Sequence, residues 1–482
     1  MQRSTCLLVG LFAFLSCPLY AQNAAAQGGV SSASFSMARS GLPMEPASIL
    51  IEEFINYHRH AIAEPMGAAV ALDVRFGAPA CGPRQKEAVL QVGLASTRHR
   101  IHSDKIPPLN LAIVIDESGS MQGERIANVQ KALLAFLNKL RAGDRVSIVG
   151  FSNEARVVFR STAPLVPKAL EVAVESITAD GSTNLHAGLM LGYEEVAANF
   201  DAGKTNRVIL LTDGQANQGV TDAAEIIKQS EEFNARDIDL STIGVGYSFN
   251  HQLMRSLTDA GRGLLHFVGD EADIEKTFVE ELESLLAPVA RRVSVVIEYD
   301  ESLELVNMRG YTPEHDGRKI TIPLHDLNHG ATQVILARFR ATPQEDATEL
   351  GAKEFGVRVQ LLYHDVASRE AVRHESSATI TYNPQLPAEA PLLTDASVRK
   401  NETIAEMAQG IKELARVIAE TNDPEEASAV LAAPLKLVAA RYPDLHDEDI
   451  IRVRDTLTKY RDLLGKEAKR KAEFEREKDK NP

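Results

Sequence analysis

Residues 110–120 read Asn-Leu-Ala-Ile-Val-Ile-Asp-Glu-Ser-Gly-Ser, an apolar run that ends in an acid and two hydroxyls. A continuous apolar run such as Leu111–Ile115 predicts a strand that is buried on both faces. Asp116, Ser118 and Ser120 then place side-chain oxygens at every second position beyond the strand end, and the glycine between the serines allows a tight turn. Oxygen atoms spaced in this way suit a hard divalent cation, so further oxygen ligands are expected on neighbouring loops.

Strand and helix patterns alternate downstream of this stretch, which predicts a doubly wound, mostly parallel α/β sheet covered by helices on both faces. The predicted strands are Leu111–Ile115, Val146–Phe151, Val157–Phe159, Val208–Leu211, Leu240–Val245 and Leu264–Val268. The predicted helices are Glu124–Leu140, Pro167–Ile177, His186–Asn199, Asp222–Asn234, Gln252–Asp259 and Asp270–Leu286. The third strand follows the second through the short polar turn Ser152–Asn153–Glu154. So short a link cannot make a parallel crossover, so the third strand is predicted to be an antiparallel edge.

Two further segments supply the oxygen ligands that the first stretch requires. The polar segment Asp180–Asn184 precedes a predicted helix and contributes the hydroxyl of Thr183. Asp213 follows the apolar strand Val208–Leu211 and its terminal Thr212. Ligands of open α/β sheets bind beyond the carboxyl ends of the strands, where the strand order reverses. If the strands before Asp116 and Asp213 are neighbours there, these side chains converge.

Each of these residues also has an ordinary explanation. A single Asp at a strand end caps a turn, serines are common turn hydroxyls, a Thr before a helix caps it, and Asp-Gly is a frequent turn. One site explains all five positions together, whereas the ordinary explanations require five coincidences. Beside them, Glu117 is expected to point to solvent, and Gln215 and Asn217 are candidates for the rim of the site.

The pattern Asp116-x-Ser118-x-Ser120, followed by Thr183 and Asp213, resembles the metal-ion-dependent adhesion site (MIDAS) of von Willebrand factor type A (vWA) domains. All five family positions are filled, in the family's order. The resemblance implies that the three hydroxyls ligate Mg²⁺ and that the two carboxylates contact it directly or through water. Mn²⁺ or Ca²⁺ can also enter such an oxygen site. The implied fold is a six-stranded, vWA/Rossmann-like sheet of order 3-2-1-4-5-6 between helices.

The rest of the chain extends this resemblance to bacterial exported vWA proteins of the YfbK type, through the segment Glu52–Tyr57, sandwich-like strands and a helical C-terminal region. Strands near Val70 and Val89 match the later strands in character, so the α/β domain is expected to be an insertion into a sandwich. The expected organisation is a signal peptide at 1–21, a disordered linker at 22–47, an N-terminal helix and strands of the sandwich at 48–105, the vWA domain at 106–287, an antiparallel β-sandwich at 288–384, a helical domain at 392–464 and a charged tail at 465–482.

The N-terminus and the charge indicate where the protein acts. Arg3, the short apolar run Cys6–Ser16 and the small residues around Ala21 predict a signal peptide, hence export to the periplasm or cell surface of a bacterium. No segment is long enough to span a membrane, although lipidation of Cys17 would bring the chain close to one. Cleavage after Ala21 would leave Cys81 alone, without an internal disulfide. The net charge of −15 argues against nucleic acid as a partner.

The resulting prediction is a non-enzymatic, Mg²⁺-dependent protein–protein interaction or adhesion protein, whose metal takes a Glu or Asp carboxylate from another protein in place of a water molecule. Two alternatives stay open. The chain could be a structural or assembly factor of the envelope that uses metal only for stability. It could also be a metal-dependent hydrolase, for which Glu117 is the only nearby general base. Neither a Gly-x-Ser-x-Gly elbow nor a phosphate-binding glycine loop occurs in the sequence.

Overall fold

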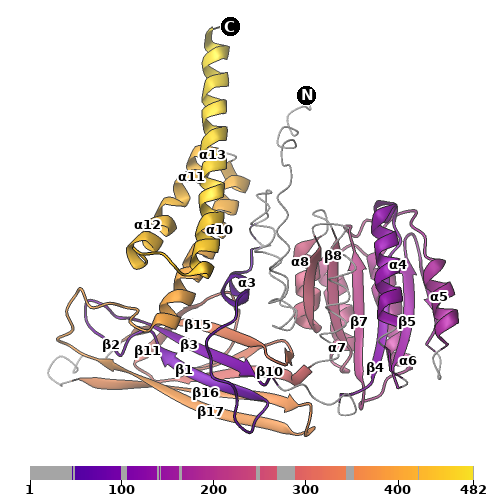
Figure 1. Cartoon of the computed structure of the whole chain (residues 1–482), viewed down its shortest axis with the longest axis horizontal. Helices are drawn as coiled ribbons and strands as arrows, with labels where there is room; N and C mark the ends of the chain where they lie inside the picture. Colours follow the sequence, from indigo (N-terminus) through magenta and orange to yellow (C-terminus); the bar gives the residue numbers. More distant parts are fainter. Residues whose placement is uncertain are drawn as a thin grey trace.

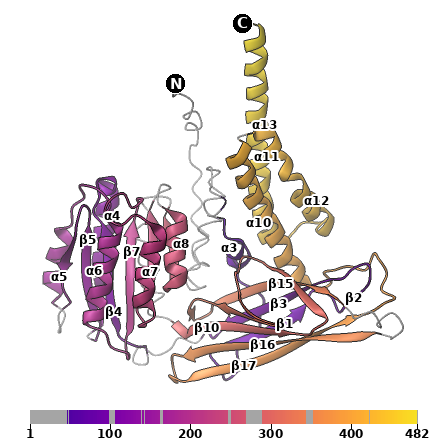
Figure 2. The same cartoon turned by 180° about the vertical axis from the view of Figure 1, so that it is seen from behind.

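The computed structural model describes residues 46, 49–98, 106–137, 140–141, 143–161, 166–245, 250–268, 288–342, 352–421 and 423–480. These residues form an α/β domain, a β-sandwich beside it and a helical region packed on the sandwich (Figures 1 and 2). The predicted signal peptide, almost all of the predicted linker and the predicted helix Asp270–Leu286 lie outside the described residues. Within the described ranges, none of the helices combines the length and the apolar character needed to cross a membrane.

The α/β domain is built on a six-stranded sheet of order β6-β5-β4-β7-β8-β9, which is 3-2-1-4-5-6 when these strands are counted along the chain. Its strands are β4 (Leu109–Asp116), β5 (Arg145–Phe151), β6 (Ala155–Phe159), β7 (Thr205–Thr212), β8 (Asp239–Val245) and β9 (Arg262–Val268). All neighbours are parallel except β6, which runs antiparallel to β5. The predicted fold class, strand order and antiparallel edge are confirmed.

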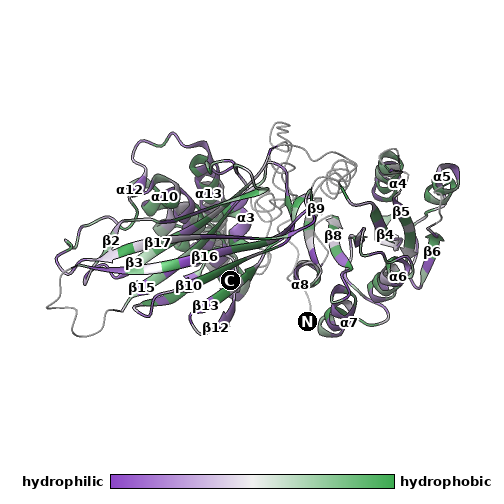
Figure 3. Cartoon of the chain, turned by 90° about the horizontal axis from the view of Figure 1, so that it is seen from below, coloured by the Kyte–Doolittle hydropathy of each residue, from purple (hydrophilic) through white to green (hydrophobic). Residues whose placement is uncertain are grey.

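Helices cover both faces of this sheet because β4 is apolar on both (Figure 3). They are α4 (Glu124–Leu137), α5 (Pro167–Glu175), α6 (Leu185–Ala198), α7 (Ala223–Asn234) and α8 (His251–Ala260), with the short 3₁₀ turn η2 (Gly119–Met121) after β4. Leu111, Ile113 and Ile115 of β4 pack with α4 and α5. The alternate residues Ala112 and Val114 pack with α6, α7 and α8. Alternate side chains of β4 thus contribute to two separate cores, one on each face of the sheet.

Helix α6 approaches the sheet closely because two glycines face it. A Cβ atom on Gly192 would lie 2.3 Å from Cγ2 of Val114, and one on Gly188 would lie 2.4 Å from Cδ1 of Phe151. Any side chain at either position would push the helix away from β4 and β5. The close packing holds the start of α6, and therefore the loop before it, against the carboxyl end of the sheet.

The sandwich consists of two sheets that enclose one apolar core. The first has the order β1-β3-β15-β11, formed by β1 (Val70–Phe76), β3 (Glu87–Ser96), β15 (Thr332–Ala341) and β11 (Leu303–Met308). The second has the order β12-β13-β10-β16-β17-β2, with β14 beside β10; these are β12 (Glu314–Asp316), β13 (Lys319–Pro323), β10 (Pro288–Tyr299), β16 (Lys353–Asp365), β17 (Ala371–Tyr382), β2 (Ala80–Cys81) and β14 (Leu327–Asn328). Strand β3 pairs with β15, so the α/β domain is inserted into the sandwich between β3 and β10.

The helical region comprises α3 (Ile51–Asn56), α10 (Ala396–Thr421), α11 (Pro424–Val430), α12 (Ala432–Arg441) and α13 (Glu448–Lys480). It packs on the outer face of the first sandwich sheet, where Val89, Val334 and Leu336 share a core with α3 and α10. Helix α13 projects away from the sandwich (Figure 1). It runs without a break across residue 464, where the sequence analysis separates a helical domain from a charged tail. The predicted charged tail is therefore helical as far as Lys480.

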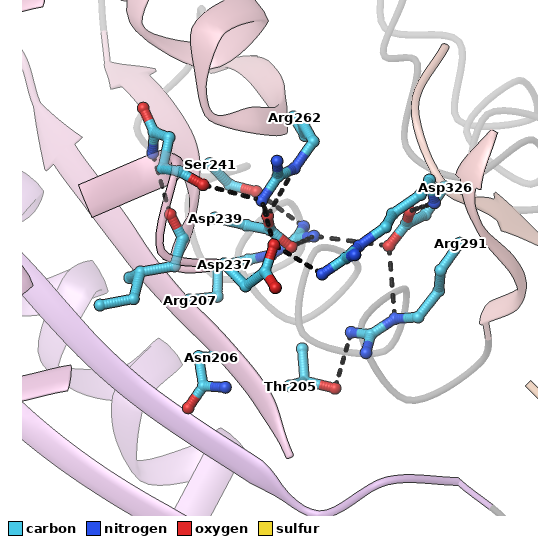
Figure 4. Close-up of polar contacts among 12 residues, drawn as sticks. Thr205, Asn206, Arg207, Asp237, Asp239, Ser241, Arg262, Arg291 and Asp326 are labelled. Atoms are coloured by element: carbon cyan, nitrogen blue, oxygen red, sulfur yellow. Dashed lines mark hydrogen bonds and ion pairs between the residues drawn. The ribbon is translucent and has the colours of Figure 1, made fainter. Parts of the chain in front are cut away.

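The α/β domain meets the sandwich at the amino ends of β7, β8 and β9, through charged side chains that we call the junction (Figure 4). The junction comprises Arg207, Asp237, Asp239, Arg262, Arg291, Arg292 and Asp326. Arg207 is its buried centre, with a side chain 4% exposed. Its guanidinium lies 3.2 Å from Asp239 of its own domain and 3.6 Å from Asp326 of the sandwich. One buried arginine therefore connects the two parts.

The backbone of the junction is also unusual. Asp237, Arg262 and Arg292 have φ angles of 65°, 53° and 51°, in the left-handed region that residues other than glycine rarely adopt. Such conformations persist only when the surrounding contacts hold them. Here the contacts are ion pairs, since Arg292 lies 2.5 Å from Asp237 and Arg262 lies 2.9 Å from Asp239.

Candidate metal site at the carboxyl end of the sheet

The candidate site lies at the end of the sheet opposite the junction. Strands β4 and β7 are parallel neighbours, and the chain leaves β4 toward β5 on its other side, so the strand order reverses between β4 and β7. Asp116 is the last residue of β4, and Asp213 follows the last residue of β7. Both acids therefore lie where the strand order reverses, as predicted from the sequence.

Asp116 is fully buried and held at both carboxylate oxygens. The backbone N–H of Ser118 donates to Oδ1 (2.8 Å), and the hydroxyl of Thr212 donates to Oδ2 (2.6 Å). Burial raises the pKa of Asp116, and the nearby carboxylate of Asp213 raises it further, while the hydrogen bonds from Ser118 and Thr212 act in the opposite direction. Each oxygen keeps a lone pair, so the carboxylate is oriented and can still bind a cation.

A chain of hydrogen bonds joins the two serines to Asp213. The hydroxyls of Ser118 and Ser120 are 3.0 Å apart, and Ser120 Oγ donates to Oδ1 of Asp213 (2.7 Å). The other oxygen of Asp213 accepts from Nη1 of Arg125, in the first turn of α4, at 2.5 Å. Asp213 is buried with the other oxygens, whereas Ser120 is exposed, so the cluster has one side open to solvent.

Thr183 reaches the same place from the loop before α6. A Cβ atom on Gly214 would lie 3.3 Å from Thr183 Oγ1 and 3.8 Å from Asp116 Oδ2, so both oxygens border the space that this glycine leaves. Asn217 fixes the loop: its Oδ1 accepts from the N–H of Thr183 (2.8 Å), and its own N–H donates to the Thr183 carbonyl (3.1 Å). The structure thus brings all five predicted site residues together.

Glu117 does not point to solvent, and that expectation is wrong. Its side chain is buried, lies 2.6 Å from Nη2 of Arg156, and covers Gly150, where a Cβ atom would come within 2.4 Å of the Glu117 Cδ. Burial raises the pKa of Glu117, and the Arg156 guanidinium opposes that rise. Gln215 and Asn217, by contrast, are exposed beside Asp213, as expected of residues at a rim.

The residues fit a hard divalent cation. Two carboxylates and three hydroxyls provide oxygen atoms only, the donors that Mg²⁺ and Ca²⁺ prefer. Within the described ranges, no group of three or more His, Cys, Asp or Glu side chains is arranged to hold a metal ion. The hydrogen-bond donors to Asp116 are uncharged, and burial raises the pKa of its carboxyl group. A bound cation would compensate the charge of this carboxylate.

Two side chains of the site were not predicted from the sequence. Thr212 carries the hydroxyl that orients Asp116, and Arg125 pairs with Asp213. Thr212 is the polar end of an apolar strand, which is a detectable signal, but a sequence cannot show which neighbour its hydroxyl meets. Arg125 lies in the first turn of helix α4 beside other polar residues, and nothing in its spacing distinguishes it.

The α/β domain belongs to the doubly wound class and carries an oxygen-rich cluster at its switch point, and comparison with known proteins identifies the kind of domain. Residues 110–280 match the family model of the von Willebrand factor type A domain. The chain therefore carries a von Willebrand factor type A domain.

Relatives resemble more than this domain. The chain is 28% identical over 268 residues to the uncharacterized protein YfbK of Escherichia coli, an alignment that covers 54% of this chain and 46% of YfbK. It is 26% identical over 274 residues to the uncharacterized protein sll0103 of Synechocystis, covering 55% of this chain and 64% of that protein. The chain thus spans about half to two thirds of the length of these relatives.

A solved structure shares the fold of most of the chain. The von Willebrand factor type A protein from Catenulispora acidiphila superposes with a TM-score of 0.61 at 18% identity, and covers 82% of this chain and 89% of that one. That coverage exceeds the α/β domain, so the likeness extends into the flanking parts.

Proposed function

We propose that this chain is a non-enzymatic, Mg²⁺-dependent protein–protein interaction protein that binds an acidic residue of its partner at the candidate metal site. The observation that carries the proposal is the convergence of five oxygen-bearing side chains, four of them buried, on one partly open cluster at the switch point of the sheet. A bound Mg²⁺ would supply a coordination position that a Glu or Asp of a partner can fill. Mn²⁺ and Ca²⁺ are the other cations that the donors suit.

Some residues of the site would hold the cation, and others orient those residues. Asp116, Ser118, Ser120, Thr183 and Asp213 would hold the cation. Thr212 and the backbone of Ser118 keep Asp116 oriented, and Asn217 keeps the Thr183 loop in place. The exposed Gln215 and Asn217 lie where a partner would contact the rim.

The geometry gives little support to hydrolysis. A metal-dependent hydrolase needs a general base near the cation, and Glu117 was the only candidate in the sequence. That carboxylate is buried over Gly150 and paired with Arg156. It is therefore engaged beside β5 and β6 and is not available to a water molecule in the cluster.

Calorimetry with Mg²⁺ tests the metal site. We expect the wild-type protein to bind Mg²⁺ and Asp116→Ala to lose at least about 100-fold in affinity, because a buried carboxylate ligand is removed. Asp180→Ala is the matched control, since Asp180 is an exposed acid two positions before Ser182 in the same loop region. Equal Mg²⁺ affinity in Asp116→Ala and wild type would contradict the proposal.

Affinity capture from envelope extract tests the partner. A protein that is retained with Mg²⁺, released by a chelator and not retained by Asp116→Ala supports metal-mediated binding. Retention that ignores the chelator, together with a melting shift on adding Mg²⁺, would instead identify a structural or assembly factor whose metal serves stability.

We also propose that the protein is exported to the bacterial envelope, because residues 1–21 have the composition of a signal peptide. Fractionation of cells followed by N-terminal sequencing of the mature protein tests this. A mature chain that begins after Ala21 in the periplasmic fraction is the expected result, and recovery of the full-length chain from the cytoplasm would contradict it.

A further inference from the structure

The two carboxylates of the candidate site differ in their surroundings. The hydrogen bonds to Asp116 come from an amide and hydroxyls, all of them uncharged. Asp213 instead forms an ion pair at 2.5 Å with Arg125, whose side chain is 28% exposed while that of Asp213 is 0% exposed. Arg125 also donates to the carbonyl oxygen of Ser120 (3.1 Å), so its guanidinium is held against the cluster by a ligand loop and by an acid together.

This ion pair changes the charge that a cation meets. Asp116, Asp213 and Arg125 together carry one negative charge, because the arginine neutralises one of the two acids. A divalent cation in the site then leaves one net positive charge. Without the arginine, the two carboxylates would cancel the charge of the cation completely, and an incoming anion would meet a neutral site.

We propose that the charge of Arg125 lowers the affinity of the site for Mg²⁺ and raises the affinity of the Mg²⁺-loaded site for an acidic ligand. This inference rests on the proposed metal site and adds to it: it predicts that the two affinities change in opposite directions when the charge is removed.

The test compares Arg125→Gln with wild type in two titrations. Calorimetry with Mg²⁺ alone should show binding about tenfold tighter in Arg125→Gln, because a nearby like charge is removed. Acetate then serves as the carboxylate probe, titrated into the Mn²⁺-loaded protein while the paramagnetic broadening of its methyl proton signal is followed. We expect acetate to bind about tenfold more weakly to Arg125→Gln.

Two variants keep the test specific. Arg125→Lys retains the charge and should stay close to wild type in both titrations. Arg141→Gln is the matched control, since Arg141 pairs with Asp144 at 3.0 Å with almost the same exposures, 27% and 0%, but at the other end of the sheet. It should lower stability without changing the affinity for Mg²⁺ or for acetate.

The melting temperature provides a second measurement, which needs Mg²⁺ but no acidic ligand. In chelator, Arg125→Gln should melt below wild type because Asp213 is left buried without its cation, and Mg²⁺ should raise its melting temperature by more than it raises that of wild type. Arg125→Met is the second neutral variant if Arg125→Gln does not fold.

The outcomes separate the inference from the proposed function. If wild type binds Mg²⁺ and Arg125→Gln binds it equally or more weakly, the role of Arg125 is overturned while the metal site stands. If Arg125→Gln binds Mg²⁺ more tightly but acetate equally well, the transfer of binding strength to the ligand is overturned. If wild type itself binds no divalent cation, both proposals fall.

Discussion

The two ends of the six-stranded sheet use charge in opposite ways. At the amino end, the acids Asp237, Asp239 and Asp326 are matched by four arginines, and these ion pairs join the α/β domain to the sandwich. At the carboxyl end, Asp213 pairs with Arg125, whereas the equally buried Asp116 receives hydrogen bonds only from uncharged donors. A fully compensated cluster can only hold parts together, whereas an acid that lacks its counterion can bind a cation from solution. The deficit of positive charge, and not the number of acids, therefore distinguishes the end of the sheet that carries the candidate site.

The largest effect is expected at the centre of the junction. Arg207→Met should lower the free energy of unfolding by about 3–4 kcal/mol, because Asp239 and Asp326 lose their buried partner and keep only the more exposed Arg262 and Arg291. Urea unfolding followed by circular dichroism measures this loss, and calorimetry should show unchanged Mg²⁺ affinity. A loss below about 1 kcal/mol would mean that the junction behaves as a solvent-screened surface, and the contrast between the two ends would fail.

Low pH should reduce the free energy of unfolding through His58, a residue that lies at neither end of the six-stranded sheet. Burial lowers the pKa of His58 to about 4. The unfolded chain therefore takes up the proton first, so this contribution to stability is full above the ordinary pKa of 6.5 and falls as the pH drops from 6.5 toward 4. The loss at pH 4 should reach about 3 kcal/mol.

Thermal unfolding at several pH values measures this loss in wild type and in His58→Gln, which should show a flatter dependence. The neighbouring His60 has a pKa well below its usual value, also through burial, and keeps part of the dependence in the variant. An equally steep profile in His58→Gln would exclude His58 as the source.

A smaller effect is expected from the hydroxyl that orients Asp116. Thr212→Val removes the donor to Oδ2 of Asp116 at nearly constant volume. We expect Mg²⁺ affinity to fall about tenfold, as for other groups that orient a metal ligand. Thr258→Val is the control, because Thr258 is equally buried but its hydroxyl donates to a helix carbonyl. Unchanged affinity in Thr212→Val would show that Asp116 needs no orientation by its neighbour.

The smallest effect is expected at the edge of the junction. Arg292 pairs with Asp237 at 2.5 Å, but the two side chains are 50% and 48% exposed. Arg292→Gln should therefore cost less than about 1 kcal/mol, since exposed ion pairs contribute little. Urea unfolding of this variant beside Arg207→Met measures how steeply the contribution of an ion pair rises with burial. If the two variants lost equal free energies of unfolding, burial would not determine how much an ion pair of the junction contributes to stability.

The sequence predicted the carboxyl end better than the amino end, for a physical reason. Asp116 and Asp213 each follow an apolar strand, and parallel strands bring such ends together, so periodicity and order were sufficient. The junction could not be predicted, because Arg207 and Asp326 come from different domains and their meeting depends on how those domains dock. The prediction that Glu117 points to solvent was wrong for a similar reason. Its burial depends on the space beside Gly150 and on the pairing with Arg156, which come from other strands.

The insertion of the α/β domain has a consequence for the order in which the parts can fold. The six strands of the α/β sheet lie in one continuous part of the chain, from Leu109 to Val268, so this domain can complete its hydrogen bonding as soon as that part has been synthesised. The sandwich cannot, because β3 must wait for β15, which follows the whole inserted domain. Until then β1 and β3 remain an isolated hairpin, which is marginally stable in water. A nascent chain thus completes the α/β domain before it can complete the sandwich that carries it.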